Sequence, residues 1–400
     1  MESVPVPATT VGEVFSLFGE QYRHAHKLPV QQRKTMFALQ QCRTAALGGH
    51  VDICNSCGHT RVFYNSCRNR HCPRCQGLKK IQWVDRLSSH LLPVRYFHIV
   101  FTLPSELNRL SLVNQKCVYN ILFKAASESL LTLAKDQKYL HALTGMVAVL
   151  HTWGQNLMEH PHLHTLVPAG GWSEVAQSWK ASRKKFFLPV KVISALFKGK
   201  FLSLLKVAYQ TGELKFEGEI KPLKRKENFK QLLNTLYQKP WVVYAKKPFR
   251  NSAAIVNYLA RYTHRVAIDN GRILSIEDGQ VSFRWKDYKK QGAKGTMKLS
   301  GEEFIRRFLL HVLPKGFCKI RYYGIFASRI RSTMLQHCQK ATGLSPAPSR
   351  FAGLDWKAVL LLAYRIDVSL CPVCKSGTME LQRTFKSLRS PPEIVRKIVL

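Results

Sequence analysis

The feature of the sequence that most constrains its fold is a pair of C-x-x-C motifs near residue 60. The first motif holds Cys54 and Cys57, and the second, about fifteen residues later, holds Cys72 and Cys75. A tetrahedral zinc ion takes four thiolates, and two such motifs joined by a hairpin commonly supply them. The spacing therefore predicts one structural zinc site formed by these four cysteines, with buried free thiols as the alternative.

Other cysteines give weaker signals. Cys67 and His71 lie between the two motifs, and either could replace one of the four ligands. A further C-x-x-C motif, Cys371–Cys374, stands far along the chain in LCPVCKSG. His337 and Cys338 could complete a metal site with it, but the spacing is long. We therefore interpret the late motif as a degenerate half-knuckle in a small tail.

The charge of the chain points to a polyanionic partner. There are 62 lysine and arginine residues against 24 acidic residues, a formal net charge of +38. Nucleic acid is the expected partner, because the basic residues run from Arg23 to Arg396 rather than forming one cluster beside a membrane. The first residues carry no recognisable secretion signal, and no apolar run approaches the ~18 residues of a spanning helix. We expect a cytoplasmic protein whose 11 cysteines are thiols or metal ligands.

Periodicity and turn residues predict a mixture of helices and short strands. Helices are predicted at 31–47, 77–93, 113–135, 191–209, 251–265 and 300–314. Strands are predicted at 96–103, 146–153, 162–169, 272–278 and 280–288. Asp278-Gly279 is expected to turn the last two strands into a hairpin, and Ser300 with Glu303 forms a capping box for the last helix.

Histidines alternate along the strand 162–169. His162 and His164 are two residues apart, so their side chains project from the same face of the strand. Two neutral imidazoles on one face can hold a divalent metal ion and leave positions for substrate and water. His151 is the candidate third ligand, because a turn centred near 157–158 would place it opposite His164. A solvated strand face is the alternative.

Two tyrosines lie four residues apart in the predicted helix 251–265. Tyr258 and Tyr262 share one helical face, and three basic side chains surround them: Arg261, His264 and Arg265. Core aromatics are the alternative for this pattern alone. Combined with the histidine strand, the pattern suits a single-strand DNA endonuclease, in which a metal polarises the phosphate and a tyrosine oxygen forms a 5′-phosphotyrosine. Nearby cations favour the phenolate, whose unperturbed pKa is ~10.

Four blocks of the sequence, in this order, closely resemble the two-tyrosine rolling-circle transposases of bacterial insertion sequences, which belong to the HUH endonuclease superfamily. The blocks are YNSCRNRHCPRCQ, YFHIVFTLP, LHTWGQNLMEHPHLHTLVPAGG and NYLARYTHRVAIDN. The later stretch RYYGIFASR also fits the family. The resemblance covers roughly residues 15–375.

The resemblance implies an α+β fold, in which an HUH-type domain with a small antiparallel sheet flanked by helices follows a helical, zinc-knuckle domain. His162 and His164 would be metal ligands, and Tyr258 and Tyr262 the paired nucleophiles. The enzyme would nick single-stranded DNA at the element ends and transfer the strand to a target, with Mg²⁺ or Mn²⁺ as the working ion beside a structural Zn²⁺. Because Mg²⁺ prefers oxygen ligands, histidines suit Mn²⁺ or Zn²⁺ better.

Several basic segments are candidates for DNA contact. Within the zinc knot, phosphate contacts are expected from Arg68, Arg70 and Arg74, and beside the tyrosines from Arg261, His264 and Arg265. The blocks WVVYAKKPFR and SFRWKDYKK interleave aromatic with cationic residues, which suits base stacking beside phosphate contacts on single-stranded DNA. Solvated strand faces are the alternative.

The sequence divides into three expected domains. Residues 1–92 would form a helical and zinc-binding DNA-recognition domain, 93–315 the catalytic domain, and 316–400 a basic C-terminal segment. A rolling-circle replication initiator or relaxase is the nearest alternative function, since it would use the same chemistry. A non-catalytic zinc-dependent DNA-binding regulator would keep the cysteines and the charge but would need neither His162 nor Tyr262.

Overall fold

The chain folds into two compact units, which are described separately. The computed structural model describes residues 9–183, 187–246, 249, 256, 267–287 and 292–387. The first unit combines residues up to 82 with parts of 264–312 and 351–400, and the second holds parts of 83–263 and 313–350. Parts of 264–312 and 351–400 thus pack with the N-terminal region, while the functional division at residues 92 and 315 stays a prediction.

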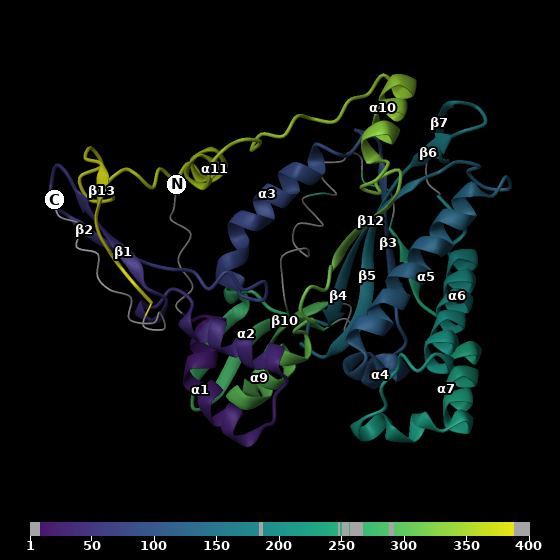
Figure 1. The fold of residues 1–400 in the computed structure, drawn as a ribbon, viewed down its shortest axis with the longest axis horizontal. Helices are drawn as coiled ribbons and strands as arrows, with labels where there is room; N and C mark the ends of the chain where they lie inside the picture. The colour runs from purple at the N-terminus through teal and green to yellow at the C-terminus, as the bar shows by residue number, and fades with distance from the viewer. Residues whose placement is uncertain are drawn as a thin grey trace. The chain divides into compact units, whose positions relative to one another are not determined.

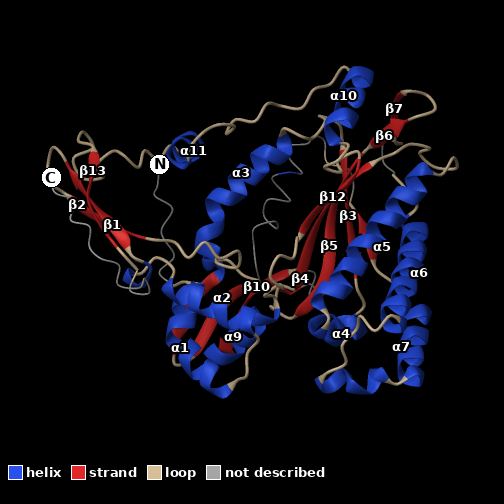
Figure 2. Ribbon diagram, viewed as in Figure 1, coloured by secondary structure: helices blue, strands red, loops and turns tan. Residues whose placement is uncertain are grey.

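The first unit contains four helices and two antiparallel three-stranded sheets among its described residues. Its helices are α1 (Val11–Ala25), α2 (Val30–Gln41), α9 (Gly301–Leu310) and α11 (Trp356–Tyr364). One sheet has the order β13 (Met379–Phe385), β1 (Gly49–Cys54), β2 (Thr60–Tyr64). The other has the order β11 (Ala293–Ser300), β10 (Gln280–Asp287), β9 (Ile273–Glu277). Figure 2 separates these strands from the surrounding helices by colour.

Local signals in the first unit behave as the sequence predicts. Asp278 and Gly279 have φ angles of 49° and 71°, the left-handed pair that a two-residue hairpin turn requires. Ser300 accepts a hydrogen bond from the backbone N–H of Glu303 at 3.2 Å and so caps α9. The predicted hairpin and the predicted helix are both confirmed.

The second unit is built on a five-stranded antiparallel sheet. Its strand order is β12 (Ile320–Gly324), β4 (Gly145–Trp153), β5 (Glu159–Pro168), β3 (Tyr96–Thr102), β8 (Val243–Ala245). A two-stranded ribbon is formed by β6 (Gly170–Ser173) and β7 (Ser178–Ala181). The helices are α4 (Asn108–Val113), α5 (Gln115–Lys135), α6 (Val190–Gln210), α7 (Lys226–Gln238) and α10 (Arg331–Thr342), while α3 (Gln76–Ser88) leads into this unit. Figure 1 shows α5 and α6 side by side along the sheet.

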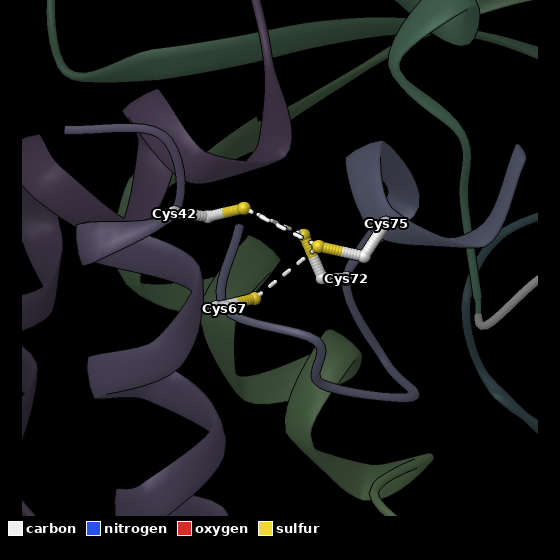
Figure 3. A group of neighbouring side chains, drawn as sticks. All are labelled: Cys42, Cys67, Cys72 and Cys75. Carbon is white, nitrogen blue, oxygen red and sulfur yellow. Dashed lines mark hydrogen bonds between the residues drawn. The ribbon is translucent and has the colours of Figure 1, made fainter. Parts of the chain in front are cut away.

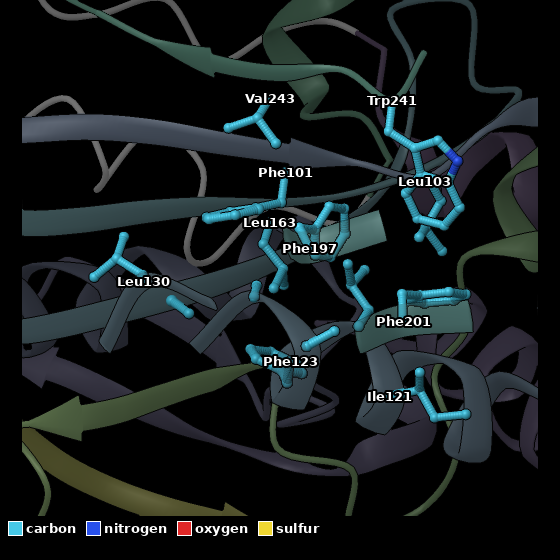
Figure 4. Packing of buried hydrophobic residues seen from close by; sticks show 14 of the residues in the cluster. Phe101, Leu103, Ile121, Phe123, Leu130, Leu163, Phe197, Phe201, Trp241 and Val243 are labelled. Carbon is cyan, nitrogen blue, oxygen red and sulfur yellow. The ribbon is translucent and has the colours of Figure 1, made fainter. Parts of the chain in front are cut away.

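One face of this sheet is covered by a large apolar core. Phe101 of β3 and Leu163 of β5 are fully buried there. Phe123 of α5 and the pair Phe197 and Phe201 of α6 complete the layer, and the rings of Phe101 and Phe197 meet edge to face at 5.1 Å (Figure 4). Since side chains alternate between faces of a strand, Leu163 on this face leaves its neighbours His162 and His164 on the opposite one.

The described structure is an α+β fold with small antiparallel sheets and a zinc-binding region at its N-terminal end, as expected. None of the helices within the described ranges combines the length and apolar character that crossing a membrane would require.

Candidate metal centres

Three histidines meet on the sheet face opposite the apolar core. His162 and His164 lie on β5, and His151 lies on the neighbouring strand β4. One ring nitrogen of each lies within 4.8 Å of the others, and all three side chains are buried. The structure therefore brings together the three residues that the sequence singles out as candidate ligands.

The register of the hairpin differs from the expected one. His151 pairs with His162, and His164 pairs with Val149. The turn closes earlier than expected, with the Gly154 N–H donating to the carbonyl of Met158 at 2.9 Å. An irregularity between residues 151 and 153 accommodates this shift. His151 still reaches His164, because the two rings on the same sheet face lie 4.4 Å apart between centroids.

Hydrogen bonds fix the orientation of both β5 imidazoles. Nδ1 of His162 lies 2.5 Å from the carbonyl oxygen of His160, to which it can donate a proton. Nδ1 of His164 lies 2.9 Å from Nε2 of His98, a buried residue of β3. These contacts leave the two Nε2 atoms 3.1 Å apart. Metal-binding histidines typically use their second ring nitrogen in this way.

Burial keeps these imidazoles neutral. Desolvation lowers the pKa of His162 to about 3 and places the pKa of His164 well below its usual value. Burial, with a smaller effect of Lys246, lowers the pKa of His98 to about 4. Neutral imidazole is the form that binds metal. Three imidazole nitrogens fit Mn²⁺ better than Mg²⁺, and they leave coordination positions for oxygen ligands.

The two tyrosines lie outside the described residues, as do Arg261, His264 and Arg265. Val256, in the same sequence segment, is described. It is 1% exposed and belongs to a buried cluster with Tyr96, Val147 and Leu166. Leu166 is paired with Val147 and lies two residues after His164 on β5, so this cluster shares the sheet face of the histidines.

A group of four cysteines lies in the first unit (Figure 3). Cys42 follows α2, Cys67 follows β2, and Cys72 and Cys75 border a short 3-10 turn. Cys42 Sγ lies 3.5 Å from the sulfurs of both Cys72 and Cys75, and Cys67 Sγ lies 3.6 Å from that of Cys75. Around a tetrahedral zinc ion with Zn–S bonds of about 2.3 Å, the sulfurs are about 3.8 Å apart. The group therefore has the size of a zinc tetrathiolate.

The four-cysteine set expected from the sequence is wrong as a grouping. Cys54 and Cys57 do not join Cys72 and Cys75 but lie beside Cys371 and Cys374. The reason is the hairpin β1–β2, which carries Cys54 and Cys57 at its turn. Cys42 precedes β1 and Cys67 follows β2, so both leave the opposite end of this hairpin. That end lies five residues away from Cys54 along β1, roughly 17 Å at the rise of an antiparallel strand. The late motif Cys371–Cys374 is therefore not a lone half-knuckle.

The four thiols of the group in Figure 3 have different pKa values. Hydrogen bonds with Cys67 and Cys72 lower the pKa of Cys42 to about 7, and the contact with Cys42 also lowers the pKa of Cys75. Contacts with Cys42 raise the pKa of both Cys67 and Cys72. A zinc ion would favour ionisation of all four thiols.

Several basic and aromatic residues have structural contacts that bear on the expected DNA surface. Arg74 donates to the carbonyl of Cys42 at 3.3 Å and to the hydroxyl of Thr10 at 3.1 Å, so it ties α1 to the cysteine group. Arg68 is exposed. Trp241 and Phe283 are core residues, 5% and 0% exposed, and cannot stack on DNA bases as the sequence blocks suggested. DNA contact by the remaining exposed residues stays a prediction.

Sequence reasoning missed Cys42 and His98. Cys42 lies outside both C-x-x-C motifs, and the available signal was that Cys67 also lies outside them and needed partners. His98 stands in the strand motif YFHIVFTLP, where a single polar residue interrupts an apolar run. That interruption on a buried strand was the available signal.

Two family models match the chain. A family model described as "Putative transposase" matches residues 145–333, and one described as "Transposase zinc-binding domain" matches residues 14–103. The first match contains the three histidines and both tyrosines, and the second contains the four cysteines of Figure 3.

Two curated relatives match over most of the chain. "Putative transposase y4qJ" of Sinorhizobium fredii is 46% identical over 385 residues, which cover 96% of this chain and 97% of the relative. "Transposase for insertion sequence element IS801" of Pseudomonas savastanoi pv. phaseolicola is 27% identical over 353 residues, 85% of this chain and 81% of the relative. No solved structure matches the chain.

Proposed function

Because the chain belongs to the insertion-sequence transposases with an N-terminal zinc-binding domain, we propose that it cuts single-stranded DNA at element ends through a tyrosine nucleophile. The cut strand is then transferred to target DNA by rolling-circle transposition. The observation that carries this proposal is the group of three buried histidines whose ring nitrogens meet on one sheet face. The named relatives favour a transposase over a replication initiator or relaxase.

His151, His162 and His164 would hold a divalent cation in this scheme. A bound cation would polarise the scissile phosphate and offset its developing negative charge. The chain's own contribution is orientation, since the His160 carbonyl and His98 hold the two β5 rings with both Nε2 atoms facing the same point. Mn²⁺ is the ion expected to support cleavage best, and oxygens of DNA and water would complete its coordination.

Tyr258 and Tyr262 are the proposed nucleophiles. Val256, two residues before Tyr258 in the sequence, is buried on the sheet face that carries the histidines, and this supports the assignment. In the cut, the phenol oxygen bonds to phosphorus and the bond from phosphorus to the 3′ oxygen breaks. That oxygen takes a proton and leaves as a 3′-hydroxyl, while the 5′ end stays on tyrosine. Attack by another 3′-hydroxyl reverses the step and rejoins the strand without ATP.

The test uses labelled single-stranded DNA from both flanks of the gene, with Mn²⁺ present. The wild-type protein should nick this DNA, and the double variant Tyr258→Phe, Tyr262→Phe should bind it with unchanged anisotropy but leave it intact. Full nicking by the double variant would contradict the tyrosine mechanism. Binding without any cleavage by the wild-type protein, on DNA from both ends, would favour a DNA-binding regulator instead.

A further inference from the structure

A second group of four cysteines lies in the first unit, apart from the group of Figure 3. Cys54 ends β1 and Cys57 follows in the turn, while Cys371 and Cys374 lie in the turn before β13. Cys54 Sγ is 3.6 Å from Cys374 Sγ, and Cys57 Sγ is 3.7 Å from Cys371 Sγ. These separations are close to the about 3.8 Å edge of a zinc tetrathiolate and far from the about 2.05 Å of a disulfide.

Both turns direct backbone N–H groups at the sulfurs. The N–H groups of Ser56 and Cys57 point at Cys54 Sγ, at 3.4 and 3.5 Å. On the other side the Gly377 N–H points at Cys374 Sγ at 3.3 Å. Two turns built in this way stabilise thiolates, which are the ligands that zinc requires.

Gly377 shows how closely the two turns approach. A Cβ atom at this position would lie 2.4 Å from Cys54 Sγ, so the contact excludes any larger residue. Asn55 joins the turns further, since its backbone N–H donates to the Thr378 carbonyl at 3.1 Å and its side-chain oxygen accepts from the Thr378 N–H at 2.9 Å. Segments more than 300 positions apart in the sequence thus form one compact site.

Among the described residues, the sheet beside this site has only a small apolar core. Its strand β13 pairs along β1, from Gly49 opposite Phe385 to Cys54 opposite Met379. Up to residue 387, where the description ends, the buried apolar cluster here comprises Cys54, Cys371 and Met379, with Cys374 partly buried against it. Leu381 on β13 is 63% exposed. A three-stranded sheet that buries so little needs another source of stability, and small domains commonly obtain it from a metal.

We propose that Cys54, Cys57, Cys371 and Cys374 bind a second structural zinc ion, which fastens the C-terminal strand β13 to the N-terminal hairpin β1–β2. The family model for the zinc-binding domain ends at residue 103 and so contains only half of these ligands. The N-terminal zinc-binding region is then complete only when the C-terminal segment has been made. A chain that ends before Cys371 loses one of its two zinc ions.

Alkylation of the wild-type chain tests this proposal without any variant. Cys57 and Cys318 are both exposed, but Cys318 belongs to neither cysteine group. With N-ethylmaleimide in reducing buffer, Cys318 should be modified at once and Cys57 should stay protected until a zinc chelator is added. Equal labelling of Cys57 and Cys318 before the chelator would overturn the proposal, as would a disulfide among the four cysteines.

A zinc count on the intact chain gives the second measurement. Native mass spectrometry should find two zinc ions in the wild-type protein and one in the double variant Cys371→Ser, Cys374→Ser. The matched control Cys117→Ser, Cys318→Ser removes two cysteines outside both groups and should keep two ions. One ion in the wild-type protein, or two in the Cys371, Cys374 variant, would overturn the proposal. Neither readout depends on DNA cleavage, so failure of the transposition mechanism would leave both results interpretable.

Discussion

The histidine group and the cysteine groups assemble metal ligands in different ways. The histidines come from adjacent strands of one hairpin and supply three nitrogens, which leaves positions on an ion for substrate. Each cysteine group supplies four sulfurs, which fill a tetrahedral ion. One pair of contacting cysteines, Cys54 and Cys374, is separated by 320 positions. On the proposals above, the cysteine sites would stabilise the fold, and the histidine site would leave room on its ion for DNA.

Loss of a cysteine from the buried group should have the largest effect on stability. Cys72 is 2% exposed and contacts Cys42 in this group. Cys72→Ser should release the zinc of this group and unfold the surrounding part of the first unit, since structural zinc contributes on the order of 10 kcal/mol in small zinc domains. Zinc content and thermal unfolding followed by circular dichroism would measure this. An unchanged melting temperature would show that the group is not structural, and Cys117→Ser serves as the control.

Loss of a histidine should instead remove chemistry and leave the fold intact. We expect His162→Ala to keep its zinc ions and its melting transition but to lose metal-dependent DNA cleavage to background, because it removes one of three ligands. The measurement is a cleavage time course over a Mn²⁺ titration, beside a zinc count. Cleavage with the same metal dependence as the wild-type protein would refute the assignment of this ligand.

His98 should have a smaller effect, because it acts through His164. His98→Ala removes the partner of His164 Nδ1 and should weaken Mn²⁺ binding by about 10–100-fold, the usual cost of losing such a contact. His98→Gln keeps a polar partner and should recover part of the affinity. Electron paramagnetic resonance of free Mn²⁺ measures the affinity without DNA.

His160→Ala is the matched control for the His98 variants. It deletes an imidazole from the same strand but keeps the backbone carbonyl that orients His162. Its Mn²⁺ affinity should stay within a few-fold of the wild-type value. Equal losses in His98→Ala and His160→Ala would mean that His98 has no special positioning role.

Mild acid should lower the free energy of unfolding of the unit that carries the histidines. The pKa of His98 is about 4 and that of His162 about 3, both below the about 6.5 of an unfolded chain. Protons therefore bind preferentially to the unfolded chain below pH 6.5, so stability present above that pH is lost as the pH falls toward 3. At pH 5 the loss is about 2 kcal/mol for each of these histidines in the metal-free protein.

Urea unfolding at pH 7.5 and pH 5 measures this loss, using the transition that does not respond to a zinc chelator. His98→Gln should show a shallower pH dependence than the wild-type protein. Identical slopes in the two proteins would contradict the assigned burial of His98.

The sequence predicted sites made by neighbouring segments better than sites made by distant ones. The face shared by His162 and His164 follows from strand alternation, and the sequence also identified His151, although the turn shifted its partner from His164 to His162. The grouping of Cys54 with Cys371 could not be predicted, because motif spacing does not reveal which hairpin end faces which segment. The buried position of Trp241 was likewise hidden, since only tertiary packing distinguishes a core aromatic from a stacking surface.

The central claim is that a tyrosine of this chain becomes covalently attached to DNA. The most direct measurement is to incubate the wild-type protein with single-stranded DNA from the element ends and Mn²⁺, digest the mixture, and sequence any DNA-linked peptide by mass spectrometry. The account predicts a phosphotyrosine bond to the 5′ end at Tyr258 or Tyr262. A link to a different residue, or cut DNA with no protein attached, would contradict it.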